Sequence, residues 1–552
     1  MSQVKQGFSF CSVLKFSFGW ALAIFLVLLS SCSQKIEYDD KLIFRYNSHS
    51  GISSLDPAFS KAQYEIWACN QIFNGLVQMD RELNVLPAIA EKWTMDSTAT
   101  IYSFKIRKDV YFHENECFAE SKSRKVNSFD FLYSFQRLLS KELAAPGSWV
   151  FKNVKQFSCP DSNTFKIELK HPFPPFLGLL SMKYCSVIPK EAVDFYGANF
   201  RSNPVGTGPF YFKIWLENEK LVFRKNNNYF EKDEKGNSLP YLESIAISFI
   251  PDKQAAFLEF IKGNMDFISG IDASYKDELL NPLGELNAKY VEQFELYRSP
   301  YLNTEYLAFL MDSTQDVLKN SPLKSKKIRQ AINYGFDRKK MMRYLRNNIG
   351  SPAYSGIIPK GLKAFDSLKI KGYTYQPELA AKLLEEAGFP NGQGLPAIKI
   401  QTNASYLDLC EYIQGELSKL GMNIEVEVSP PSTLRQAISS SKVDFFRASW
   451  IGDYPDSENY LSLFYSKNWC PNGPNYTHFK SELFDQWYLQ SSKETNDSLR
   501  ILLYQKMDSL VISEAPIVPL YYDEVLRFYP KTISGLEGNP MNLLDLKRVS
   551  KK

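Results

Sequence analysis

Residues 397–453 read AIKIQTNASYLDLCEYIQGELSKLGMNIEVEVSPPSTLRQAISSSKVDFFRASWIGD, and this stretch decides the expected fold. Short apolar-rich strands are predicted at 397–402, 423–428 and 443–449, with helical patterns between them. Crossover helices return a chain to the same edge of a sheet, so the three strands are expected to be parallel. The stretch therefore predicts an α/β fold.

Two helices are expected between these strands. The first, at 406–420, is followed by Gly421, a residue that readily ends a helix. It carries its apolar side chains on one face: Leu407, Cys410, Ile413, Leu417 and Leu420. The second is expected at 432–439, after two prolines. The segment 450–454 (WIGDY) then leaves the carboxyl end of a parallel strand, where open α/β sheets bind ligands, so we expect a binding site there.

Three further elements are predicted outside this stretch. Residues 101–110 alternate as a half-buried strand, 210–214 with 220–224 form a hairpin around Glu217 and Asn218, and 377–387 form a helix that begins with proline and ends before Gly388. No internal repeat and no linker between independent modules is evident. The domains are therefore expected to pack together or interweave.

Length and composition indicate a folded protein of several domains. A chain of 552 residues is too long for one core and predicts roughly three to four domains. Hydrophobic residues make up 44% and charged residues 23%, which excludes disorder, collagen and coiled coil as the main character. Subtracting Lys5 and Lys15 of the leader described next from the net charge of +4 leaves +2. This charge gives no support to nucleic-acid binding.

The first 31 residues are predicted to be a signal peptide. Two lysines and no acid precede the apolar run 16–29, which spans about 21 Å and is too short to cross a bilayer. Residues 29–32 (LSSC) resemble a bacterial lipobox, which implies that Cys32 carries lipid and that 32–40 form a solvated tether. Ordinary secretion with a free Cys32 is the alternative. Ser33 after the cysteine favours the outer over the inner membrane in a host that has both.

The remaining cysteines do not form a recognisable framework. Six are left after Cys11 and Cys32, none in a CxxC motif, which argues against zinc and against a disulfide-rich scaffold. Cys159 and Cys185 could pair, but the sequence leaves this open. The four histidines include no HExxH, and neither GxSxG nor GxxxxGK[ST] occurs. The sequence thus predicts neither an enzyme nor a cofactor or metal.

Several stretches together resemble the family 5 extracellular solute-binding proteins, the oligopeptide and dipeptide receptors of ABC importers. They cover nearly the whole mature chain: SLDP (54–57) with IFNGLV (72–77), LPAIAEKW (86–93), YSFKIRKDVYFH (102–113), NPVGTGPF (203–210), LPYLESIAISFIPD (239–252) and APIVPLYY (515–522). The first two regions together with 102–113 are the most specific. The chain is identified as a member of this family.

The resemblance implies a type II periplasmic-binding fold with three lobes that encloses its ligand in an interlobe cleft. Lobe I would comprise 41–75, 200–300 and 521–552, lobe II 76–199, and lobe III 301–520. A membrane permease and cytoplasmic ATPases are implied partners, because this chain has no ATP-binding motif. The protein would act as a monomer at the cell envelope and would deliver short peptides to the permease.

The same resemblance implies which residues bind the ligand. Asp453 matches an aspartate that receives the peptide α-ammonium, with a role as helix N-cap or turn residue as the alternative. Arg447 matches an arginine that receives a ligand carboxylate, with an interlobe salt bridge as the alternative. Trp450 would form an aromatic wall, with core packing as the alternative, and Tyr454 and Trp149 are further candidates for ligand contact. Lys61, Ala62 and Gln63 match the wall that pairs with the peptide backbone.

The chain departs from its relatives at three ligand-facing positions. Lys61 stands where an acid can occur, Pro431 where an aromatic can stack, and Gly147 where a tyrosine can reach the ligand. These departures leave the length and sequence of the peptide open. They also leave open a same-fold receptor for an oligosaccharide or other non-peptide solute. A surface adhesin or chaperone-like lipoprotein without a permease is the alternative from another class.

Overall fold

In the computed structural model, which describes residues 42–272 and 274–552, the three predicted strands form a parallel ladder. β14 (Ile398–Thr402) pairs in parallel with β15 (Ile424–Val428) on one side and with β16 (Phe445–Ile451) on the other. The predicted order of strands and helices is confirmed, with α11 (Leu407–Ser418) and α12 (Pro431–Ser439) as the crossovers. β16 ends two residues later than predicted, so Trp450 and Ile451 belong to the strand and the loop begins at Gly452.

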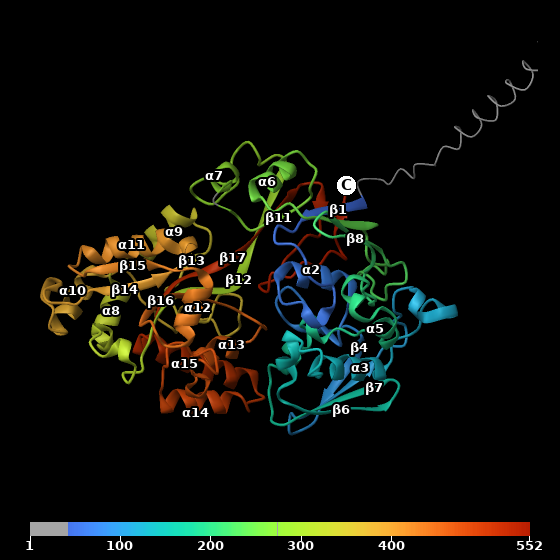
Figure 1. Cartoon of the computed structure of the whole chain (residues 1–552), viewed down its shortest axis with the longest axis horizontal. Helices are drawn as coiled ribbons and strands as arrows, with labels where there is room; N and C mark the ends of the chain where they lie inside the picture. Colours follow the sequence, from blue (N-terminus) through green and yellow to red (C-terminus); the bar gives the residue numbers. More distant parts are fainter. Residues whose placement is uncertain (1–41, 273) are drawn as a thin grey trace, which may run out of the picture. The chain divides into compact units, whose positions relative to one another are not determined.

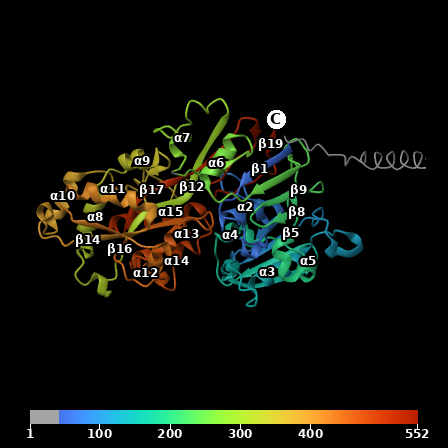
Figure 2. The same cartoon turned by 45° about the horizontal axis from the view of Figure 1, so that its top comes forward.

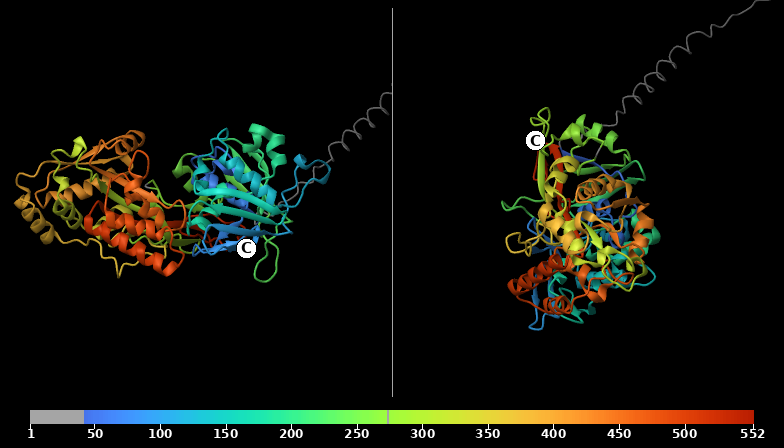
Figure 3. Two further views of the ribbon diagram at one scale, coloured as in Figure 1. Left: turned by 90° about the horizontal axis from the view of Figure 1, so that it is seen from below. Right: turned by 90° about the vertical axis from the view of Figure 1, so that its left-hand side faces the viewer.

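These strands belong to a larger, mixed sheet of seven strands. Beyond β16 lie two long strands, β12 (Phe294–Phe309) and β17 (Ile517–Pro530), which are antiparallel to each other. Figure 3 shows the two strands, one yellow-green and one red, side by side in two further views. The short strands β11 (Ile268–Ser269) and β13 (Ser351–Pro352) pair with β17. Segments more than 200 residues apart in the sequence therefore share this sheet.

Helices cover both faces of the seven-stranded sheet. Along β12, Leu307 and Phe309 pack into one core and Tyr306 and Ala308 into another, because alternate side chains point to opposite faces. The first core is covered by α8 (Lys326–Tyr334), α9 (Arg338–Arg346), α10 (Pro377–Glu386) and α11. The second is covered by α13 (Glu458–Leu461), α14 (Glu482–Ser491) and α15 (Asp497–Glu514), and Figure 1 shows the two groups of helices apart from each other.

Two four-stranded sheets form the rest of the described chain. One has the order β1 (Ile43–Asn47), β10 (Ser244–Ser248), β9 (Lys220–Lys225), β8 (Phe210–Leu216), and it contains the predicted hairpin, with Asn218 at a φ of +59°. The other has the order β4 (Ala90–Met95), β5 (Ile101–Ile106), β7 (Thr164–Leu169), β6 (Val154–Asp161). Figure 2 labels β1, β8 and β9 near α2 (Gln63–Ile72), and α3 (Ser128–Leu139) packs on β6 and β7.

Smaller elements link these sheets. They are β2 (Val77–Met79), β3 (Val85–Pro87), α4 (Phe176–Leu180), α5 (Lys190–Tyr196), α6 (Lys253–Ile261), α7 (Lys276–Leu279), β18 (Ile533–Ser534) and β19 (Ser550–Lys551). The six cysteines from Cys69 onward are free thiols, so Cys159 and Cys185 form no disulfide. Among residues 42–272 and 274–552, no helix combines the length and apolarity needed to cross a membrane. The predicted signal peptide, Cys32 and the tether lie outside the described residues.

The glycine-rich segment 203–210 shows why its residues are needed. The amide of Gly208 donates to the carbonyl of Ile72 at the end of α2, at 2.7 Å. A Cβ on Gly208 would lie 2.4 Å from the carbonyl carbon of Ile72, and a Cβ on Gly206 would lie 2.2 Å from its oxygen. Only glycine permits this approach of backbone to backbone, which fixes the chain where it re-enters the sheet at β8.

Candidate functional site

A cavity of about 420 Å³ lies where the loop after β16 meets the segments from the first 200 residues. Its volume is in the range of small-molecule sites. The C-terminal segment 539–547 also contributes. The lining comes from 60–70, 74–79, Trp149, 178–184, Tyr301, 451–455 and 539–547, with Ala88, Pro209 and Tyr229. The cavity thus includes the end of a parallel strand, as the sequence predicted.

Asp453 lies in this cavity on the loop that follows β16. Its backbone amide donates to the side-chain carbonyl of Asn459 at 3.0 Å, and the Asn459 amide lies 3.4 Å from the Asp453 carboxylate. Asp453 caps no helix. The turn before α13 is closed instead by Asp456, whose carboxylate accepts from the amide of Glu458 at 2.9 Å. Asp453 also forms no ion pair within the described chain, and its carboxylate is accessible from the cavity.

The surroundings of Asp453 favour binding of a cation. Asp453 is exposed to the cavity, but the neighbouring protein partly desolvates its carboxylate and raises its pKa, while the Asn459 amide opposes the shift. The carboxylate is close enough to Tyr184 to raise the pKa of that phenol, after desolvation, which is the larger cause. A cationic ligand group would replace the hydration that Asp453 has lost.

Aromatic side chains form one wall of the cavity. The rings of Trp149 and Tyr454 lie 6.3 Å apart, and the Tyr454 hydroxyl donates to the buried carboxylate of Glu458, which fixes the orientation of the ring. Tyr184 lies directly over Gly147, because a Cβ on Gly147 would be 2.3 Å from the Tyr184 ring. The space that a tyrosine at position 147 would fill is therefore occupied by Tyr184, from another part of the chain.

The predicted backbone-pairing wall is only partly in the cavity. Lys61 and Gln63 line it, whereas Ala62 is exposed at the N-terminus of α2 and does not. The Gln63 amide donates to the carbonyl of Asn542 at 3.1 Å, and the Trp67 indole donates to the same oxygen at 2.7 Å. These bonds fix α2 against the C-terminal segment that forms part of the cavity.

Two predicted residues, Arg447 and Trp450, lie outside the cavity lining. Arg447 forms a buried salt bridge with Glu305 of β12, and its guanidinium lies 3.2 Å from the centre of the Tyr406 ring. A salt bridge was the alternative considered for Arg447, but it was expected between lobes, whereas Glu305 lies on the neighbouring strand of the same sheet. Trp450 donates through its indole to Asn459 at 2.8 Å. It therefore supports the Asp453 loop from behind.

Sequence reasoning missed several residues that line or support the cavity. Lys183, Tyr184, Asp545 and Lys547 are in its lining, and Asn459 holds the Asp453 loop. Lys547 is held by the carboxylate of Glu231 at 2.9 Å, by Asp545 at 3.5 Å and by the side-chain carbonyl of Gln78 at 2.8 Å. Of these residues, only Tyr184 had a usable signal in the sequence, namely the missing side chain at Gly147.

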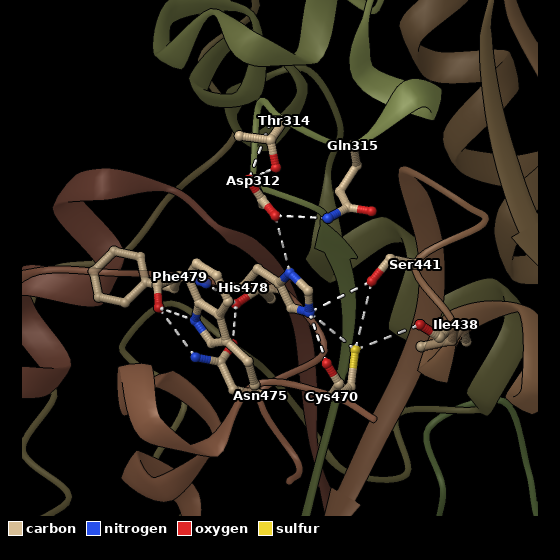
Figure 4. A network of polar contacts seen from close by, with 11 residues as sticks. Asp312, Thr314, Gln315, Ile438, Ser441, Cys470, Asn475, His478 and Phe479 are labelled. Carbon is tan, nitrogen blue, oxygen red and sulfur yellow. Dashed lines mark hydrogen bonds and ion pairs between the residues drawn. The ribbon is translucent and has the colours of Figure 1, made fainter. Parts of the chain in front are cut away.

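A second polar cluster has the order nucleophile, base, carboxylate but lies away from the cavity. Figure 4 shows Cys470, His478 and Asp312 pointing toward one another, with 3.2 Å from Cys470 Sγ to His478 Nε2 and 3.5 Å from His478 Nδ1 to Asp312 Oδ2. Burial alone would lower the pKa of His478, but its bonds to Cys470 and Asp312 raise it overall. Both the thiol and the imidazole are buried, and Trp469 stacks on the imidazole at 4.5 Å. We interpret the cluster as a structural tie between the end of β12 and the loop 466–479.

The sheets and the cavity are those of a binding protein with a type II periplasmic-binding fold. Residues 84–471 match the family described as bacterial extracellular solute-binding proteins, family 5 Middle, and the chain belongs to this family. It is a family of binding proteins and not of enzymes. The resemblance noted in the sequence is thereby confirmed.

Known proteins similar to this chain extend over almost its full length. The glutathione-binding protein GsiB of Escherichia coli strain K12 is 24% identical over 523 residues, 93% of this chain and 94% of GsiB. The structure of HbpA2 from Haemophilus parasuis covers 92% of this chain and 100% of its own, at 23% identity and a TM-score of 0.80. DppA from Helicobacter pylori, in complex with the peptide STSA, covers 92% and 98% at 22% identity and a TM-score of 0.72. These structures support the fold.

Proposed function

We propose that this protein is the substrate-binding component of an ABC importer and captures short peptides for delivery to a membrane permease. The family, the peptide bound to DppA and the glutathione named for GsiB support this assignment. A permease and its ATPases are the partners that the function requires. The lobe boundaries expected from the sequence, 41–75 with 200–300 and 521–552, 76–199, and 301–520, remain part of this proposal.

The observation that carries the proposal is the Asp453 carboxylate. It lies in the cavity without a cationic partner in the described chain, and it performs no capping role. A peptide α-ammonium supplies a full charge and up to three donors, and charge-assisted hydrogen bonds are stronger than neutral ones. Trp149, Tyr184 and Tyr454 would pack against the peptide, and Lys61 and Gln63 would contact its backbone. Arg447, Trp450 and Ala62 act, in this proposal, only through the structure around the site.

A neutral oligosaccharide is the competing solute within the same fold. The aromatic wall suits a sugar ring, but a neutral sugar would leave the carboxylate of Asp453 partly desolvated and unpaired. The charged lining therefore favours a peptide. A surface adhesin or chaperone-like lipoprotein would need neither the cavity nor a permease.

The attachment to the membrane is a further part of the proposal. The lipobox-like LSSC at 29–32 supports lipid on Cys32, with 32–40 as the tether that connects the lipid to the folded chain. The protein would act as a monomer at the cell envelope, facing the periplasm or exterior. Ser33 favours the outer membrane in a host with two membranes.

The ligand itself provides the test of the function. Native mass spectrometry of the purified mature protein should detect a bound species with the mass of a short peptide, since solute-binding proteins release enclosed ligands slowly. Calorimetric titration with the identified peptide, after the protein has been unfolded and refolded to remove it, should then give saturable binding. Recovery of a sugar, or no binding of any peptide of two to five residues, would overturn the proposal.

A further inference from the structure

Lys183 is a lysine of the cavity whose ammonium has no hydrogen-bond or ion-pair partner among the described residues. It lies in the short helix Lys183–Cys185, its side chain is partly buried, and it lines the cavity. Within the part of the chain that the structure describes, no hydrogen bond or ion pair satisfies its ammonium. Its pKa is lowered to about 8, mainly by desolvation, with the charge of Asp545 opposing the shift and that of Lys547 adding to it.

Lys547, in the same cavity, shows what a satisfied lysine looks like. Burial alone would lower its pKa, but Asp545 and Glu231 raise it overall, and Gln78 accepts a third contact. The two lysines thus differ in their ion pairs: Lys547 contacts Glu231 and Asp545, whereas Lys183 has no ion pair among the described residues and is affected by the charge of Asp545 only without contact. A partly desolvated cation without a partner costs free energy, which an anion delivered from outside would offset.

We propose that Lys183 binds a carboxylate of the captured solute, so that the solute bridges Asp453 through its ammonium and Lys183 through an anionic end. This rests on the proposed peptide function and narrows it to short peptides with a free carboxylate. Tyr184, the next residue, also lines the cavity, and the charge of Asp453 contributes to raising the pKa of its phenol after desolvation, so the segment that carries Lys183 and the Asp453 loop border the same site.

The cavity suits a short peptide. Its volume of about 420 Å³ is in the range of small-molecule sites, and both Asp453 and Lys183 belong to its lining. Both charged side chains are therefore open to one ligand.

Calorimetric titration of four protein–peptide pairs tests the assignment. Wild type and Lys183→Met are each titrated with a tripeptide and with its C-terminal amide. In the wild type, amidation should weaken binding about thirtyfold or more, as expected for loss of one partner of a desolvated charge pair. In Lys183→Met, the free acid should bind as weakly as the amide. Lys155→Met, which removes a lysine of β6 outside the cavity lining, should bind as the wild type does.

A proton count gives an independent readout. Because a carboxylate raises the pKa of a lysine, binding at pH 8.5 should take up more protons in the wild type than in Lys183→Met. The α-amino group of the peptide, with a pKa of about 8, takes up a proton on Asp453 in both proteins, so the difference between them reports Lys183. Titration in two buffers of different ionisation enthalpy measures this. The groups that face Lys183 are Asp545 and Lys547 on the C-terminal segment, Cys69 on α2 and Cys185. Burial raises the pKa of both thiols well above this range.

Three outcomes can be distinguished. Equal binding of acid and amide by the wild type would overturn the inference, and so would discrimination that persists in Lys183→Met; in both cases the peptide function stands. Failure of the wild type to bind either peptide would instead overturn the proposed function. Lys183→Met should melt no lower than the wild type, since it removes a desolvated charge, and Lys183→Arg should retain the preference for the acid if the methionine variant does not fold.

Discussion

At the scale of single residues, Asn459 decides how Asp453 presents its carboxylate. One side-chain oxygen accepts from the Asp453 amide and from the Trp450 indole, and the side-chain nitrogen lies 3.4 Å from the carboxylate. Asn459 itself is buried. It is a positioning residue in the proposed function, because it fixes the loop and leaves the outer side of the carboxylate for a ligand.

Asn459→Ala is expected to weaken binding of a peptide with a free N-terminus about tenfold, because the Asp453 loop loses three contacts. In the Asp453→Asn background, the same change should cost less than about threefold, since interacting residues are not additive. Calorimetric titration of the two single variants and the double variant measures the coupling. Equal effects in both backgrounds would mean that Asn459 supports only the fold.

The sequence predicted part of this site. Asp453 and Tyr454 could be located because they follow a parallel strand, and the edge of such a sheet is a general binding position. Lys183, Tyr184 and Lys547 could not, because their positions depend on contacts between segments hundreds of residues apart. Arg447 was assigned to the ligand by resemblance, but it forms a salt bridge with Glu305. This partner is on a neighbouring strand, and no local pattern in the sequence reveals that pairing.

At the scale of elements, the contact between the glycine segment and α2 should be intolerant of any side chain. Gly208→Ala places a Cβ 2.4 Å from the backbone of Ile72, and backbone cannot move as a flexible side chain can. We expect a loss of about 3 kcal/mol in the free energy of unfolding, measured by urea denaturation.

The matched control is Gly415→Ala in α11. No atom lies within 4 Å of a Cβ at Gly415, and alanine is the better helix former. This variant should gain up to about 1 kcal/mol. Similar effects of the two substitutions would contradict the role assigned to the close approach.

The same segment carries a pH-dependent contribution through His113. The ring donates to the carbonyl of Gly208 at 2.9 Å and accepts from the amide of Gly206 at 3.3 Å, and burial lowers its pKa to about 4 although the Gly208 carbonyl opposes this. Between pH 6.5 and 4, the unfolded chain therefore binds a proton that the folded chain does not. Stability is full above pH 6.5 and decreases as the pH falls toward 4.

His113→Gln should remove this dependence. The stability difference between wild type and variant should shrink by about 2 to 3 kcal/mol between pH 7.5 and pH 4.5. The comparison with the variant is needed because Asp508 also makes the stability of the protein depend on pH. Burial raises its pKa to about 7, so its contribution to the stability of the folded state is present at low pH and is lost as the pH rises. A difference that stays constant with pH would show that His113 is not buried in the neutral form.

The positions of the strands and helices were more predictable from the sequence than the pairing of the strands. Strands at 398–402, 424–428 and 445–451 and the helices between them follow from periodicity within short windows. On α11, Leu409 is buried and the predicted Leu407 is only half-buried, so the buried face begins with Leu409 and Cys410. The antiparallel partners β12 and β17 come from distant segments, and pairing of that kind leaves no local signal.

At the scale of the whole molecule, Cys32→Ser should leave the protein soluble or unprocessed. The lipobox-like sequence and the short apolar run motivate this expectation. Metabolic labelling with a fatty acid, followed by fractionation of cells, should show label and membrane association in the wild type only. Undiminished label on the variant would contradict lipid attachment at this cysteine.

The central claim is that the cavity holds a peptide through its α-ammonium on Asp453. The most direct measurement is calorimetric titration of wild type and Asp453→Asn with a short peptide and with the same peptide acetylated at its N-terminus. Asparagine keeps the size of the side chain but removes its charge, so binding of the free peptide should weaken about thirtyfold or more. Binding of the acetylated peptide should change little. Equal losses for both peptides, or no loss for either, would contradict the account.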